Sequence, residues 1–225
     1  SAHRLVLMQF LDLTLKSLNL LKKIKQFSVV ASLVLASLWV TLGNAPCYAD
    51  TAPSDVVTAF HQALTTAMKS GSYQNRLSVV EPAVTSHFQI HTIARISLGR
   101  HWRSLNAEDQ AGFLLLLKDL VTSTYASRFK EDSGQVFSIR ATEPIATNRK
   151  RVKSILETST EIVTLDYQLQ QEDGIWRIYD IVANGVSDLS LKRSNYSAMF
   201  KKGGLESVRQ DILSSIAANA LAQEE

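Results

Sequence analysis

The chain has 225 residues, of which 45% are hydrophobic and 20% are charged, and it carries a formal net charge of +3. This composition excludes a disordered chain, and the length fits one domain of ordinary size or two small ones. The positive charge lies in residues 1–49, so residues 50–225 hold 19 basic and 20 acidic side chains. A balance of this kind excludes a broad nucleic-acid-binding surface, and we predict no nucleic-acid partner.

A basic and then apolar leader opens the chain. Three lysines at positions 22–25 precede an uncharged run over residues 27–42, which is shorter than the ~20 residues of a membrane-spanning helix. Ala49 then supplies the small residue that precedes a cleavage point, so we predict a secretory signal peptide cut after Ala49. The alternative is an uncleaved anchor. Cys47 is the single cysteine, so residues 50–225 contain no disulfide or thiolate site.

Residues 53–129 are predicted to be mainly helical, because their apolar side chains recur at helical intervals. Pro82 is expected to begin a new helix, since proline is tolerated in a first turn but not in an interior. The consecutive apolar residues 113–117 predict a central helix that is enclosed on most sides. We therefore expect helices over residues 53–68 and 73–80, from Pro82, over 88–99, and over 106–129 with Asn106 as its cap.

After residue 134 the apolar period changes to two, which predicts strands. Helical spacing returns after Gly185, where Ser187 is expected to cap a helix that Gly203 and Gly204 later interrupt. The connections are too short for parallel crossovers, so we predict a single α+β domain over residues 50–225 with an antiparallel four-stranded sheet. The expected strands are 135–140, 151–158, 162–170 and 175–183, and the expected helices are 189–200 and 205–221.

The residues show little catalytic chemistry. His87 and His91 have the spacing of two metal ligands on one helix face, but Phe88 stands where a zinc protease needs glutamate. We find no nucleophile elbow, phosphate-binding loop or dinucleotide fingerprint, and we predict no metal, no cofactor and no enzymatic activity. The alternative is an enzyme on an NTF2-like cone, with Asp166 or Asp180 as its general base.

Two stretches resemble the MlaC, or toluene-tolerance, family of periplasmic lipid carriers. Residues 88–110 contain FQIHTIARISLGRHW followed by LNAEDQ, and residues 176–196 contain WRIYDIVANGVS followed by KRSNY. The KRSNY stretch and residues 125–134 are closer to the hopanoid-associated HpnM branch of that family. The resemblance covers most of residues 53–218 and is weakest over residues 135–153.

The resemblance implies a soluble periplasmic protein that holds the acyl chains of a phospholipid or a hopanoid between its helices and a curved sheet, in an apolar cavity of NTF2-like appearance. The balanced charge and the absence of cysteines and of a heptad seam in residues 50–225 predict a monomer. The resemblance also implies transport between an outer-membrane lipoprotein (MlaA-like) and an inner-membrane ABC transporter complex (MlaD-like subunit), as in systems that maintain outer-membrane asymmetry. Two chains of about 16 carbons carry about 30 methylenes, whose burial at ~0.8 kcal/mol each amounts to some 20 kcal/mol. Binding on this scale needs a long dry slot and no catalyst.

The lipid slot is expected to be lined by apolar side chains from two helices and the sheet, with Val186 at the mouth. The same positions also fit a plain hydrophobic core, and a membrane-anchored adaptor with a protein partner is a third interpretation of the chain. The expected slot residues are Ile93, Ala94, Leu98, Leu117, Val121, Tyr125, Leu165, Tyr167, Tyr179, Ile181, Val182 and Val186.

Overall fold

The computed structural model describes residues 51–222, and the predicted leader with its cleavage point lies outside these residues. The described part has helices and strands in the order that the periodicity predicts, which confirms the α+β class. Among these residues, no helix combines the length and the apolar character needed to cross a membrane. The elements are α2 (Pro53–Met68), α3 (Tyr73–His87), α4 (Ile90–Leu98), the 3-10 helix η1 (Gly99–Ser104), α5 (Ala107–Arg128), β1 (Val136–Ala146), β2 (Arg149–Glu157), β3 (Ile162–Glu172), β4 (Ile175–Ala183), β5 (Val186–Ser187) and α6 (Asp188–Leu221).

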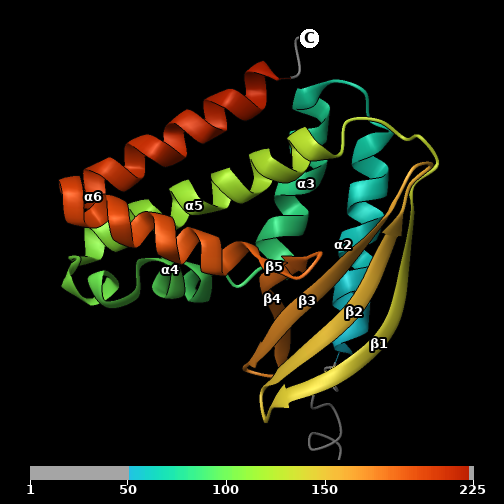
Figure 1. Ribbon diagram of the computed structural model, residues 1–225, viewed down its shortest axis with the longest axis horizontal. Helices are drawn as coiled ribbons and strands as arrows, with labels where there is room; N and C mark the ends of the chain where they lie inside the picture. Colours follow the sequence, from blue (N-terminus) through green and yellow to red (C-terminus); the bar gives the residue numbers. More distant parts are fainter. Residues whose placement is uncertain (1–50, 223–225) are drawn as a thin grey trace, which may run out of the picture. The chain divides into compact units, whose positions relative to one another are not determined.

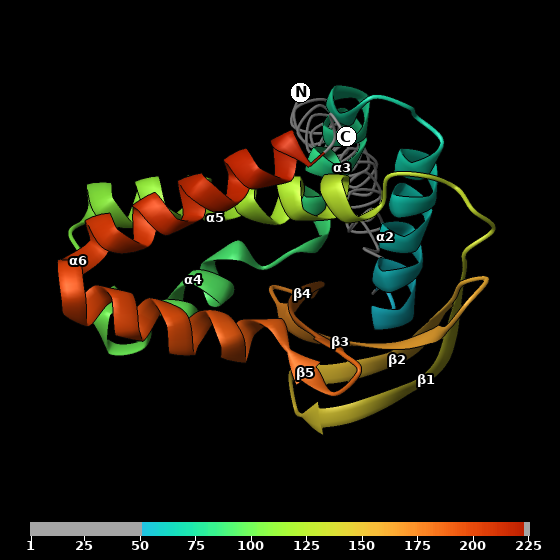
Figure 2. The ribbon, with the colours of Figure 1, turned by 45° about the horizontal axis from the view of Figure 1, so that its top comes forward.

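The domain is built as a layer of helices over a curved antiparallel sheet. Figure 1 shows α2 running along the sheet, and Figure 2 shows α5 and α6 in the layer beyond it. Phe60 of α2 lies at the centre of the core, fully buried, with ring centroids 4.9 Å from Phe88 and 5.0 Å from Tyr125. Aromatic edge-to-face packing of this kind joins α2 to α5.

The sheet has five strands in the order β1-β2-β3-β4-β5, so the prediction of four strands was wrong. The additional strand is the pair Val186–Ser187, which pairs with the end of β4 through Val182 and Ala183. Asn184 (φ 47°) and Gly185 (φ 82°) form the connection, and two successive positive φ angles are typical of a tight hairpin turn. The Asn-Gly dipeptide is the sequence signal for such a turn.

Two helices differ from their predictions. Helix α3 continues through Pro82, because Val80 and Val84 are fully buried and their packing against α2 and α5 outweighs the lost backbone hydrogen bond. Helix α5 is not enclosed on most sides: Phe113 and Leu117 are buried, but the Leu115 side chain is 64% exposed. Consecutive apolar residues point in all directions around a helix, so such a run does not identify the buried side.

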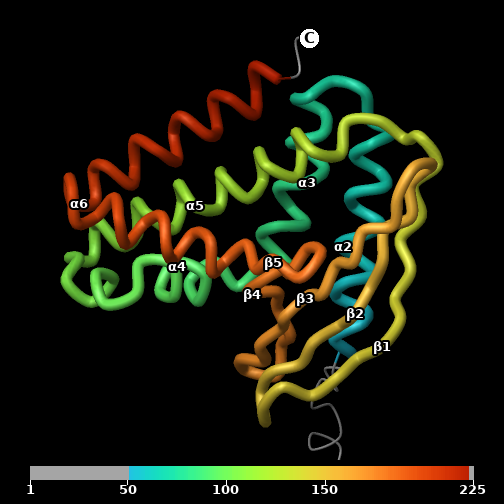
Figure 3. The backbone as a smooth tube through the Cα atoms, in the orientation of Figure 1, coloured from blue at the N-terminus to red at the C-terminus, as the bar shows by residue number. Residues whose placement is uncertain are grey.

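Helix α6 doubles back on itself. Its backbone leaves the helical region at Gly203 and Gly204, which confirms the predicted interruption. Gly204 has φ 64° and ψ −159°, a conformation that only glycine adopts readily. The tube in Figure 3 shows the two halves as an antiparallel hairpin, with the second half returning beside α5.

Candidate functional site

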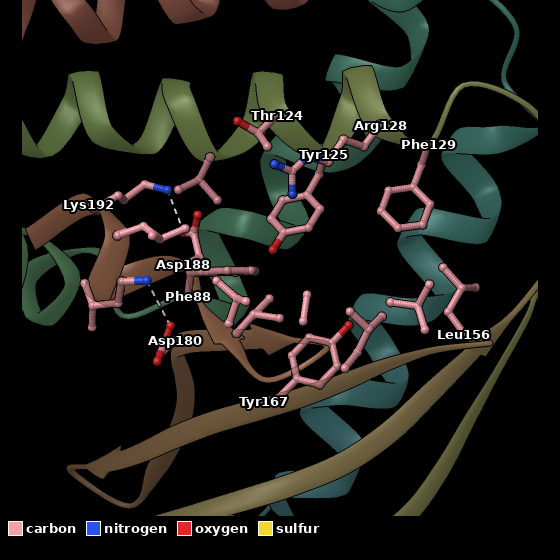
Figure 4. A pocket seen from close by; sticks show the side chains of 18 of the residues that line it. Phe88, Thr124, Tyr125, Arg128, Phe129, Leu156, Tyr167, Asp180, Asp188 and Lys192 are labelled. Atoms are coloured by element: carbon pink, nitrogen blue, oxygen red, sulfur yellow. Dashed lines mark hydrogen bonds and ion pairs between the residues drawn. The ribbon is translucent and has the colours of Figure 1, made fainter. Parts of the chain in front are cut away.

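A cavity of about 480 Å³ lies between α5, the start of α6 and the sheet, and we call it the main cavity. Figure 4 shows its side chains converging from these elements. Most of the lining side chains are apolar, and the polar ones include two acids and two bases. They are Phe88, Ile93, Val121, Thr124, Tyr125, Arg128, Phe129, Gln135, Leu156, Thr158, Val163, Leu165, Tyr167, Tyr179, Asp180, Ile181, Ala183, Val186, Asp188, Leu189, Leu191 and Lys192.

The sheet forms one wall of the main cavity, because alternate side chains along its strands point to the same face. Val163, Leu165 and Tyr167 of β3 project to one face because successive strand residues point to opposite sides. The register places Leu156 of β2 opposite Val163 and Ile181 of β4 opposite Tyr167, so these side chains share that face. The period-two pattern therefore produces one continuous apolar surface across three strands.

Eight of the twelve residues expected in the slot do line the main cavity, and four do not. The eight are Ile93, Val121, Tyr125, Leu165, Tyr167, Tyr179, Ile181 and Val186, and the four are Ala94, Leu98, Leu117 and Val182. Ala94, Leu98 and Leu117 are fully buried in the surrounding core. Val182 pairs with Asp166, on the sheet face opposite Tyr167.

A β-bulge in β4 explains the error at Val182. The register shifts between Gln168 and Leu169, where β4 carries Tyr179 as an extra residue. Ile178 and Ile181 therefore pair with residues of the cavity face, although their spacing in the sequence places them on opposite faces of a regular strand. Strict alternation along β4 cannot reveal such a shift.

Tyr179 lines the main cavity, but its hydroxyl bonds to a residue on the outer face of the sheet. Its hydroxyl donates to Gln168 Oε1 at 2.9 Å, and the Arg149 guanidinium lies 5.1 Å from its ring centroid. Both partners belong to the sheet face opposite Tyr167. Tyr179 thus connects the cavity wall to the outer side of the sheet.

Asp180 anchors the start of α6. One of its carboxylate oxygens accepts the Leu189 N–H at 3.1 Å, and the other accepts from Ser187 Oγ at 2.7 Å and from Gln168 Nε2 at 3.1 Å. Ser187 Oγ in turn accepts the Ser190 N–H at 3.0 Å, which confirms Ser187 as the helix cap. The Asp180 carboxylate therefore occupies the position at which a helix N-terminus otherwise binds an anion.

This arrangement bears on the enzyme alternative. A general base must be free to accept a proton from a substrate, whereas the Asp180 carboxylate already accepts three hydrogen bonds from protein groups. Asp166 pairs with Val182, on the face away from the cavity. Asp180 does line the main cavity, but its carboxylate oxygens are occupied by donors from the protein itself.

Tyr167, which lines the main cavity, forms a buried polar pair with His61 of α2. His61 Nε2 lies 3.0 Å from the Tyr167 hydroxyl, and the His61 ring stacks on Phe137 at 4.2 Å. Burial lowers the pKa of His61 to about 4 and raises the pKa of Tyr167, so both side chains are uncharged at neutral pH. Their polar atoms satisfy each other and leave the surrounding wall apolar.

The main cavity opens beside the first turns of α6. Two of its lining residues there, Val186 and Leu191, are each 53% exposed. Lys192 Nζ lies 2.6 Å from Asp188 Oδ2. Arg128, at the end of α5, is an exposed base that also lines the cavity.

Several lining residues were missed by the sequence prediction. Leu156 and Val163 continue the inward pattern of Leu165, so extending the period-two alternation would have found them. Phe88 was assigned to a helix, but it precedes α4 and forms an isolated bridge to Ile178 of the sheet. Its place depends on tertiary contact, which the periodicity of a single segment does not contain.

The histidine pair of the sequence, His87 and His91, lies among packing contacts. Burial and the nearby Arg177 guanidinium lower the pKa of His87, and the His91 ring packs edge-on against Trp102 at 5.5 Å. Within residues 51–222, no three histidine, cysteine or acidic side chains come together in a group that is suited to a metal ion.

Comparison with known proteins places the chain in a family. The family described as MlaC protein matches residues 55–213. The intermembrane phospholipid transport system binding protein MlaC of Haemophilus influenzae is 25% identical over 116 residues, which are 49% of this chain and 54% of that relative, so the match spans about half of the relative's length. A phospholipid-binding protein from Ralstonia solanacearum, solved in complex with a phospholipid, shares the fold with a TM-score of 0.65 at 21% identity, over 73% of this chain and 97% of that chain. Because the family match extends over well more than half of its residues, the chain belongs to the MlaC family.

Proposed function

We propose that this protein is a periplasmic carrier that holds a phospholipid by its acyl chains in the main cavity. The observation that carries the proposal is the cavity itself, whose wall is apolar inside the domain and has exposed charged side chains, Arg128 and Asp188, on its lining. An acyl chain gains about 0.8 kcal/mol for each methylene that it buries, so such a wall binds a lipid without chemistry. The head group stays in water at the mouth.

The related proteins support the same cargo. The Haemophilus relative is named for intermembrane phospholipid transport, and the Ralstonia protein was solved with a phospholipid bound. The proposal extends this cargo to the present chain on the strength of the shared family and fold. A hopanoid is the second candidate cargo, and it rests on the resemblance of KRSNY and residues 125–134 to the HpnM branch.

The remaining parts of the proposal concern location and partners. The predicted leader supports export to the periplasm, where a carrier meets both membranes. As family resemblance implies, the carrier exchanges lipid with an MlaD-like subunit of an inner-membrane ABC transporter complex and with an MlaA-like outer-membrane lipoprotein. A monomer that binds lipid in the main cavity then carries one lipid at a time.

A charge at the mouth tests the proposal. Val186→Glu places a carboxylate on a side chain that is 53% exposed, so the variant is expected to unfold within a few degrees of the wild-type protein. The carboxylate faces the alkyl chain, and burying it without a partner is strongly unfavourable. We therefore expect the variant to lose at least nine-tenths of its co-purifying lipid, measured by extraction and mass spectrometry.

Two further variants make the result specific. Val121 is only 7% exposed, so Val121→Glu should lower both the melting temperature and the lipid content. Ile175 is 46% exposed and lies outside the main cavity, so Ile175→Glu should retain both. A folded Val186→Glu protein that carries lipid at the wild-type ratio would contradict the proposal.

A further inference from the structure

Basic side chains without an acidic partner gather at one end of the domain. Figure 1 shows that the end of α4 and the bend of α6 lie there, away from the sheet, and η1 continues directly from α4. All six of these side chains are exposed, and within the described part of the chain none of them forms a salt bridge. We call them the basic patch: Arg95, Arg100, Arg103, Arg193, Lys201 and Lys202.

Contacts between η1 and α6 bring the members of the basic patch together. The His101 ring stacks on Phe200 with ring centroids 4.2 Å apart, so the bases that flank these two residues in the chain lie at the same end of the domain. A Cβ atom at Gly99 would lie 3.7 Å from Arg193 Nη2, so the Arg193 guanidinium lies against the start of η1. Arg95 precedes Gly99 by one helical turn and therefore lies on the same side of α4.

The acids at this end are too few to balance the basic patch. Glu108 and Asp109 lie in the first turn of α5, and Glu206 lies just after the bend of α6. Asp109 already pairs with Arg209, whose Nη2 lies 2.9 Å from Asp109 Oδ1. Apart from the basic patch, residues 50–225 hold 13 basic and 20 acidic side chains. The nearly balanced total therefore conceals a polarised domain with its positive end at the basic patch.

The character of the basic patch suits a surface of anionic lipids better than a protein. Protein interfaces centre on large apolar or aromatic anchors and contain few lysines. Within residues 51–222, none of the exposed large hydrophobic side chains lies in η1 or at the bend of α6. Clustered lysines and arginines attract anionic head groups by charge alone and need no matching shape.

We propose that the basic patch docks the protein on an anionic lipid surface. Lys192, the residue before Arg193, lines the main cavity. A helix rises about 1.5 Å per residue, so the bases at the bend of α6 lie about 12 Å along the helix from Arg193. Docking through the basic patch therefore brings the lining of the main cavity close to the membrane. The inference rests on the placement of charge and does not require that the main cavity contain lipid.

Charge reversal within the basic patch tests this inference. Lys201→Glu/Lys202→Glu reverses two exposed bases at the bend of α6, and Lys69→Glu/Arg140→Glu makes the same change of net charge outside the patch. None of these four residues lines the main cavity. Each exported protein is mixed with vesicles of phosphatidylcholine, either pure or containing phosphatidylglycerol, and the bound fraction is measured by flotation.

The wild-type protein is expected to bind the anionic vesicles and not the neutral ones. Raising the salt from about 0.1 M to about 1 M should release it, because the Debye length falls from about 10 Å to about 3 Å. Lys201→Glu/Lys202→Glu should bind about 25-fold more weakly or less, because each base near an anionic surface strengthens binding by about fivefold. The control variant should bind within about twofold of wild type, since its changes lie outside the basic patch.

A second pair of substitutions keeps the test independent of one site. Arg100→Gln/Arg103→Gln removes two charges from η1 and should also weaken binding to the anionic vesicles if the lysine variant fails to fold. Equal binding of anionic vesicles by the patch and control variants would overturn the inference. A wild-type protein that does not bind anionic vesicles at low salt would also overturn it, and an acidic protein surface would then be the partner that fits the basic patch.

Discussion

His61 shows how one buried residue links the cavity to the stability of the whole domain. Its imidazole lies between Phe137 and Tyr167 and makes one hydrogen bond. Burial disfavours the charged ring, so the folded protein holds a neutral histidine with a pKa of about 4, against 6.5 in the unfolded chain. Between these two values the unfolded state binds a proton that the folded state does not.

Stability is therefore expected to fall as the pH is lowered from 6.5 to 4. Above pH 6.5 the neutral His61 makes its full contribution to the free energy of unfolding. About 3 kcal/mol of this free energy is lost by pH 4, because one pKa unit corresponds to about 1.4 kcal/mol. In His61→Phe the stacking on Phe137 remains but the titration is absent. Urea unfolding at pH 7 and pH 4.5 should show a smaller acid-induced loss for the variant than for wild type.

The His61→Phe substitution is also expected to lower the free energy of unfolding at neutral pH. His61→Phe leaves the Tyr167 hydroxyl without its partner, so we expect it to be about 1 kcal/mol less stable than wild type at pH 7. Other acid-sensitive groups, including His87, are common to both proteins and cancel in the comparison. Equal losses of stability on acidification in the two proteins would show that His61 does not titrate as its burial requires.

At the scale of elements, the junction between β4 and α6 shapes the mouth of the main cavity. The Asn184–Gly185 turn reverses the chain, Val186 and Ser187 form β5, and Asp180 fixes the first turn of α6. Because Val186, Asp188 and Leu189 all line the main cavity, the geometry of this turn determines where the cavity opens.

Asp180→Asn is expected to lower the free energy of unfolding by about 2 kcal/mol, because the amide has one acceptor oxygen in place of two and a hydrogen bond to a charged group contributes about 1.5–3 kcal/mol. Asp188→Asn is the matched control in the same turn. The Asp188 side chain is 55% exposed and pairs with Lys192, so its replacement should cost less than about 1 kcal/mol. Equal stabilities of the two variants in urea unfolding would exclude the anchoring role of Asp180.

The periodicity of the apolar residues predicts most elements of this fold, but it predicts fewer of the residues that line the main cavity. The alternation of Val163, Leu165 and Tyr167 correctly identifies the strand and the face that lines the main cavity. The bulge at Tyr179 moves Val182 to the other face, and no local pattern encodes a bulge that depends on pairing with Gln168 and Leu169.

At the scale of the whole molecule, the helices supply most of the buried core and the sheet supplies a wall of the main cavity. Helices α2, α3 and α5 pack on one another and carry most of the fully buried core, including Phe60, Val84 and Leu117. The sheet offers a broad apolar face on which the helices leave the main cavity rather than a solid core. Close packing is the rule in protein interiors, so a cavity of this size indicates a site for an apolar ligand.

Native mass spectrometry of the wild-type protein, recovered from the periplasm of a bacterial host under non-denaturing conditions, tests the carrier function most directly. We expect a species heavier than the polypeptide by the mass of one two-chain phospholipid, and fragmentation that releases this lipid intact. Incubation of the delipidated protein with phospholipid vesicles should restore the heavier species. A protein that appears only at its polypeptide mass, both as isolated and after incubation with vesicles, would contradict the proposal that its main cavity carries lipid.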